Sequence, residues 1–142
     1  MRYVYNDGGR SAAYKAKTDR DCVCRVIAIA TEQPYKEVYL ALKRLAREER
    51  TGPTKWGRST VRTGTYKETF RRYLESIGWT WVPTMFVGKG CQVHLRAGEL
   101  PRGRLVVSVS KHLTAVIDGV IYDTFDCSRD GTRCVYGYFV KR

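Results

Sequence analysis

The chain has 142 residues and a formal net charge of +12, from 26 lysines and arginines against 14 aspartates and glutamates. This length suits one domain with its own hydrophobic core. A hydrophobic content of 43% with 12% aromatic residues excludes a wholly disordered chain. No apolar run reaches the length of a transmembrane helix, so we expect a single domain over residues 1–142 with no membrane partner.

The N-terminal segment, residues 1–20, is polar and is broken by Gly8-Gly9, so we expect a short strand followed by a loop. It lacks the apolar core of a signal peptide, and we therefore expect a cytoplasmic protein. The five cysteines are an odd number, and a reducing compartment would keep them as thiols.

Residues 22–31 are expected to form a buried helix. The β-branched run Val26-Ile27-Ala28-Ile29 would also suit a strand, but the apolar character is continuous, and Asp19 or Asp21 can cap the start of a helix. A helix that is apolar on nearly all sides is normally buried in a core.

Two amphipathic helices are predicted next. The first begins near Pro34 and ends near Glu49, because apolar residues recur at helical spacing between them. The second opens on the capping-box pattern Thr65-Tyr66-Lys67-Glu68, and Gly78 ends it.

Residues 51–64, between these two helices, form a long loop rich in glycine, threonine and positive charge. Residues 43–72 hold ten lysines and arginines against three glutamates, a net charge of +7. Such a charge favours an acidic partner, either nucleic acid or an acidic protein surface, although a solvated face is the simpler interpretation. The candidate binding residues are Lys55, Trp56, Arg58 and Arg62, among which the aromatic ring could stack on a base.

From Trp79 onward the sequence changes to short runs typical of β-strands. The expected strands cover residues 79–82, 104–110, 113–117, 120–124 and 135–140. Helices followed by strands with tight turns predict an α+β fold, with N-terminal helices packed on a mostly antiparallel C-terminal sheet.

Asp118-Gly119 is a strong signal for a two-residue hairpin turn. In that register His112 lies opposite Phe125, and Asp123 lies diagonal to His112 on the same face of the sheet. Asp126 falls on the other face. We therefore expect Asp123 to hold the tautomer and orientation of the His112 ring.

Cys22 stands where the helix of residues 22–31 begins. The positive end of a helix and a nearby imidazolium both favour the thiolate, which is the nucleophilic form of cysteine. The adjacent Asp21 carboxylate opposes this unless it points away or caps the helix. Cys22 could instead be a small buried residue, but with His112 and Asp123 it completes the set that thiol-dependent acyl transfer needs.

The remaining cysteines and histidine do not follow a metal-site pattern. Cys22, Cys24, Cys91 and His94 offer soft ligands, but paired C-x₂₋₄-C knuckles are missing, so no metal or other cofactor is expected. His94 is a second candidate base. No hairpin follows it to supply an acid, and we expect it to line the cleft or cap an element.

The order of a cysteine on a helix, then a histidine and an acidic residue on strands, is similar to that of papain-like cysteine peptidases, especially the C39-like branch. Several segments resemble more closely a family of small uncharacterised bacteriophage proteins. They are residues 21–31, 34–39, 79–85, 93–95, 112–119 and 130–138, and they are spread over most of residues 21–140.

The resemblance implies a papain-like fold with Cys22 as nucleophile, His112 as general base and Asp123 as orienting acid. Papain-like enzymes place a glutamine as oxyanion donor before the cysteine, and Ala16 stands at that position here. Lys17 or Thr18 could take its place, with the Cys22 backbone N–H as the second donor.

Two functions follow as alternatives. The first is a bacteriophage hydrolase or acyltransferase that acts on an amide or isopeptide of a protein substrate through Cys22, His112 and Asp123. The second is a non-enzymatic phage effector of the same fold that binds a host protein or nucleic acid through its basic face. Either protein would act in the host cell cytoplasm.

Overall fold

The computed structural model describes residues 1–13, 21–49, 59–61 and 64–141. They form an α+β domain, as expected. Its elements in chain order are β1 (Arg2–Tyr5), α1 (Arg10–Ala13), α2 (Cys22–Thr31), α3 (Tyr35–Ala46), α4 (Lys67–Ser76), β2 (Trp79–Pro83), β3 (Met85–Phe86), β4 (Gly90–Cys91), β5 (Arg104–Val109), β6 (His112–Ile117), β7 (Val120–Asp123) and β8 (Val135–Lys141).

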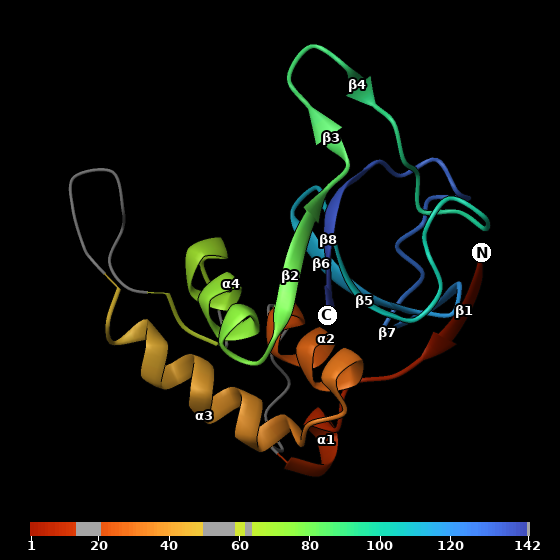
Figure 1. Ribbon diagram of the computed structural model, residues 1–142. Helices are drawn as coiled ribbons and strands as arrows, with labels where there is room; N and C mark the ends of the chain where they lie inside the picture. The colour runs from red at the N-terminus through yellow and green to blue at the C-terminus, as the bar shows by residue number, and fades with distance from the viewer. Residues whose placement is uncertain (14–20, 50–58, 62–63, 142) are drawn as a thin grey trace.

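Six strands form one sheet in the order β1-β7-β6-β5-β8-β2. Every neighbouring pair is antiparallel except β1 and β7, which are parallel. The predicted hairpin forms between β6 and β7 with Ile117 opposite Val120. Strands β3 and β4 form a separate hairpin that extends beyond the end of β2 (Figure 1), and the sequence analysis did not predict it.

Helices α2, α3 and α4 lie together on one side of the sheet (Figure 1). The core between these helices and the sheet includes Ile27, Leu42, Phe70, Leu74 and Phe139. The other face of the sheet has a second core, built from Leu105, Val107, Val116, Ile121 and the loop residues Leu95 and Cys127. Since β5 carries Val106 in the first core and Leu105 and Val107 in the second, alternate residues serve the two faces.

Helix α2 forms in spite of its β-branched residues because eight of its ten residues are buried. Tertiary packing of that kind outweighs the small propensity difference between helix and strand. Its last carbonyls are bound by Arg104 of β5, which donates from Nε to the Ala30 oxygen and from Nη2 to the Ile29 oxygen, both at 2.7 Å. Arg104 therefore fixes the C-terminal end of α2 against the sheet.

Two local predictions were wrong. The capping box at Thr65 does not form: α4 begins at Lys67 with Tyr66 as its N-cap, and the Thr65 hydroxyl has no hydrogen-bond partner among the described residues. The cysteines are not all thiols, because Cys91 and Cys134 form a disulfide with their Cα atoms 5.9 Å apart. In the part of the chain described, no helix has both the length and the apolar character to cross a bilayer.

Candidate active site

Cys22 is the first residue of α2 and is partly exposed, unlike the eight residues that follow it in the helix. The N–H groups in the first turn of a helix have no intrahelical acceptor, and the helix dipole adds positive potential at this end. Cys22 therefore lies at the positive end of α2.

The adjacent Asp21 carboxylate is fully buried and bound in a network of its own. Arg25 and Arg10 approach its Oδ1 at 2.6 and 3.1 Å through their Nη1 atoms, and the Tyr35 hydroxyl donates to its Oδ2 at 2.6 Å. Asp21 occupies the N-cap position but makes no side-chain cap hydrogen bond. The Asp21 charge is therefore balanced by Arg10 and Arg25.

His112 and Asp123 are brought together as the hairpin register predicts. The His112 Nε2 atom lies 2.7 Å from Asp123 Oδ2, with the two side chains 9% and 0% exposed. This contact leaves Nδ1 as the ring nitrogen that can exchange a proton with a thiol. Phe125 packs beside the ring, with centroids 5.0 Å apart, although β7 ends at Asp123 and its pairing with β6 does not extend to His112.

The Asp123 carboxylate is itself held by neighbours. Thr114 donates its hydroxyl to Oδ2 and the Thr124 N–H donates to Oδ1, each at 2.7 Å. The Cys127 sulfur lies 4.0 Å from Oδ2. These donors fix the orientation of the Asp123 carboxylate, and the carboxylate in turn fixes the orientation of the His112 ring.

The surroundings of His112 keep it protonated. Burial alone lowers the pKa of the ring. Hydrogen bonds with Asp123, Cys127 and Cys22, together with the Asp123 charge, outweigh burial and raise this pKa to about 11. At neutral pH the ring is therefore an imidazolium.

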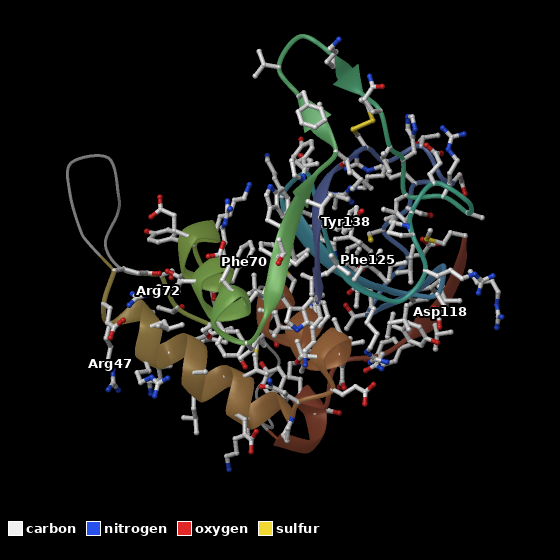
Figure 2. All side chains as sticks on the ribbon, viewed as in Figure 1. Arg47, Phe70, Arg72, Asp118, Phe125 and Tyr138 are labelled. Carbon is white, nitrogen blue, oxygen red and sulfur yellow. A yellow bond between two sulfur atoms is a disulfide. The ribbon has the colours of Figure 1, made fainter. Side chains whose placement is uncertain are left out.

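Cys22 and His112 line one cleft of about 760 Å³, which we call the Cys22 cleft. Its apolar walls include Phe70 of α4 and Phe125 of the segment after β7, both labelled in Figure 2. The other described residues that line it are Val23, Arg25, Gly64, Thr65, Lys67, Ser108, Val109, Lys111 and Leu113. This volume suits a short segment of a peptide.

The other predicted site residues do not join this cleft. His94 is not among the residues that line it, because it pairs with Cys134 across a β-bridge and its Nδ1 lies 3.3 Å from Glu99 Oε1. Of the two places expected for His94, the cleft lining is therefore not the one it takes among the described residues. The candidates Lys17, Thr18, Lys55, Trp56, Arg58 and Arg62 lie outside the described residues.

The remaining cysteines differ from Cys22. Cys24 is fully buried, and burial raises the pKa of its thiol to about 12. Cys91 forms a disulfide with Cys134, so its sulfur is not a thiolate ligand beside Cys22, Cys24 and His94. His112, Asp123 and Cys127 have ligand atoms within 4.8 Å of one another, a donor set that could hold a metal ion, although here the histidine and aspartate bind each other.

Sequence reasoning missed the part that Cys127 plays beside Asp123 and His112. It lies in a loop after β7, and strand alternation gives no position for a loop residue. The spacing of four residues between Asp123 and Cys127 was the one available signal.

No family model, curated protein sequence or solved structure matches the chain. The class that the described geometry defines is therefore an α+β protein with a cysteine, a histidine and an aspartate gathered at one cleft.

Proposed function

We propose that the chain is a papain-like, cysteine-dependent hydrolase or acyltransferase that acts on an amide or isopeptide of a protein. The observation that carries this is the placement of Cys22 and His112 on the walls of one cleft, with the His112 Nε2 atom 2.7 Å from Asp123 Oδ2. A partly exposed cysteine at a helix start, inside a cleft of peptide size, supports the same function.

In the proposed reaction the Cys22 thiolate attacks the carbonyl carbon, and the carbonyl oxygen becomes an oxyanion near the Cys22 N–H. The His112 imidazolium gives its proton to the leaving amine as the C–N bond breaks, which yields an acyl thioester on Cys22. Neutral His112 then takes a proton from water or from an acceptor amine, which displaces the thiolate. Asp123 stabilises the imidazolium throughout.

The resemblance of several segments to small bacteriophage proteins supports this function and adds the expectation of action in the host cytoplasm. The Cys91–Cys134 disulfide is typical of an oxidising compartment and weighs against the cytoplasm. The proposed location therefore has its own test, given in the Discussion.

The direct test of the function uses p-nitrophenyl acetate, an activated ester that acylates thiolates. The wild-type protein is expected to release a burst of one equivalent of p-nitrophenolate and to carry the acetyl group on Cys22. Cys22→Ala abolishes the burst, while Cys24→Ala, which changes a buried thiol of the same helix, keeps it. A burst that survives Cys22→Ala would overturn the proposal.

A second measurement separates amide turnover from acylation. New amino termini are counted in a bacterial extract incubated with the wild-type protein or with Cys22→Ala. Termini that appear with the wild type alone identify protein substrates. Acylation without such termini favours acyl transfer over peptide hydrolysis.

The alternative, a non-enzymatic effector, is supported by the net charge of +12. Lys43, Arg44 and Arg47 lie exposed at the end of α3, next in the chain to the predicted basic loop (Figure 2 labels Arg47). It predicts binding to nucleic acid or an acidic protein that weakens with salt, survives Cys22→Ala and falls when Arg58 and Arg62 are neutralised. Absence of binding at low salt would exclude it.

A further inference from the structure

The Cys22 cleft is lined by positive charge. Arg25, Lys67 and Lys111 are on its walls, and no aspartate or glutamate lines it within the described residues. Asp21 is buried and pairs with Arg25, and Asp123 is buried and bound to His112 and Thr114. The positive charge that the cleft offers to a ligand therefore comes mainly from Lys67 and Lys111. A ligand in this cleft therefore meets cations and apolar side chains.

Two of the lining residues have buried polar atoms without a hydrogen-bond partner among the described residues: Arg25 Nε and Thr65 Oγ1. The Arg25 side chain is only 5% exposed, and its Nη1 is bound to Asp21. Buried polar atoms are nearly always paired, because an unpaired one has lost its water. Both atoms therefore keep unused hydrogen-bonding capacity beside the Cys22 cleft.

The ends of two helices reinforce these groups. Helix α2 begins at Cys22 and α4 begins at Lys67, and both residues line the Cys22 cleft. Each helix has ten residues, so each contributes a full positive N-terminal end. The α4 end has no side-chain cap.

The two lysines differ in how they are held. The Lys67 Nζ lies 4.6 Å from the centre of the Trp81 ring. Lys111 has a φ of 56°, a conformation that favours glycine or asparagine, in the turn directly before His112. This turn places Lys111 next to His112 on the wall of the Cys22 cleft.

From these observations we infer that the Cys22 cleft recognises a carboxylate of its substrate, so that the substrate is an acidic peptide segment. This rests on the proposed function and specifies its substrate class. The carboxylate lies between Arg25 and Thr65, with Lys67 and Lys111 at the mouth. The apolar walls contact the adjoining part of the peptide.

The test compares two alkylating agents of nearly equal size, iodoacetate and iodoacetamide, which differ in charge. The ratio of their rate constants at Cys22, divided by the same ratio for N-acetylcysteine, isolates the effect of the cleft on an anion. We expect this normalised ratio to be about three or more at low salt and to fall toward one as salt is added.

The lysines are separated from the contribution of the His112 imidazolium by variants. Lys111→Gln and Lys67→Gln each lower the normalised ratio by about threefold, while Lys111→Arg keeps it. Thr65→Val lowers it as well and leaves the charges unchanged. Lys36→Gln removes an exposed lysine of α3 and serves as the matched control, with no change expected.

The outcomes distinguish this inference from the proposed function. Fast labelling of Cys22 by iodoacetamide with a normalised ratio near one, or a ratio that the lysine variants leave unchanged, overturns the inference alone. No preferential labelling of Cys22 by either agent overturns both. In a protection arm, tetraglutamate slows the labelling of Cys22 and tetraglutamine does not. Protection by oligothymidylate without protection by tetraglutamate also overturns the inference, since it indicates nucleic acid.

Discussion

At the scale of single residues, the protonation of His112 is set by what holds Asp123. Thr114 and the Thr124 N–H fix the carboxylate, and the carboxylate holds the His112 ring through Nε2. The same histidine has a hydrogen bond with Cys22. Three residues from α2, β6 and β7 therefore act as one unit, and the loss of one member is expected to affect the others.

His112→Gln is predicted to slow the acylation of Cys22 by p-nitrophenyl acetate by about 100-fold, because the positioned acid and base is lost. Asp123→Asn keeps the shape but removes the charge that favours the imidazolium, and it is predicted to slow acylation too. Stopped-flow release of p-nitrophenolate measures both rates. Equal rates in the wild type and His112→Gln would show that His112 has no chemical part.

The raised pKa of His112 also makes stability depend on pH. The folded protein holds this proton up to about pH 11, whereas the unfolded chain releases it near its ordinary pKa of about 6.5. The stabilisation is therefore complete below about pH 6.5 and is lost as the pH rises toward 11. Urea unfolding at several pH values should show this decline in the wild type and a flatter profile in His112→Gln. Parallel profiles would contradict the assignment.

At the scale of elements, the hairpin of β6 and β7 could be predicted most fully from the sequence. The Asp118-Gly119 turn fixes the pairing of Ile117 with Val120, and alternation then selects Asp123 over Asp126 as the partner of His112. The β3–β4 hairpin and the absence of a cap at Thr65 were missed. The β3–β4 hairpin follows Thr84, whose hydroxyl donates to the Val135 oxygen of a distant segment. No such contact among the described residues accounts for the missing cap at Thr65.

The pairing of β2 with β8 depends on one glycine. A Cβ at Gly137 would lie 2.4 Å from carbons of the Trp81 ring and 2.8 Å from the Val82 oxygen. Gly137→Ala is therefore predicted to lower the free energy of unfolding by about 1–3 kcal/mol. Thermal or urea unfolding measures the loss, and Trp81→Leu in the same chain should recover part of it. An unchanged stability of Gly137→Ala would mean that Trp81 does not cover this strand.

At the scale of the whole molecule, the sheet has a core on each face, and the site lies where its helix-covered side meets β6. The sequence predicts the order of helices and strands because hydrophobic periods are local. It does not predict the parallel pairing of β1 with β7 or the second core around Leu95 and Cys127. These arise from packing between segments far apart in the chain, for which a single sequence holds no local signal.

The disulfide is a property of the whole molecule because it depends on the compartment. Titration with a thiol reagent after unfolding without reductant should find three thiols, those of Cys22, Cys24 and Cys127. Five thiols in protein taken from the cytoplasm would contradict the disulfide there and favour the expected reducing location.

The central claim is that Cys22 is the nucleophile of a site that includes His112 and Asp123. It is tested most directly by the rate at which iodoacetamide labels each cysteine of the folded protein, resolved by peptide mass spectrometry. We predict that Cys22 is labelled well before Cys24 and Cys127, which are buried, and that His112→Gln slows the labelling of Cys22. Labelling that spreads evenly over the three thiols, or a rate at Cys22 that His112→Gln leaves unchanged, would contradict the claim.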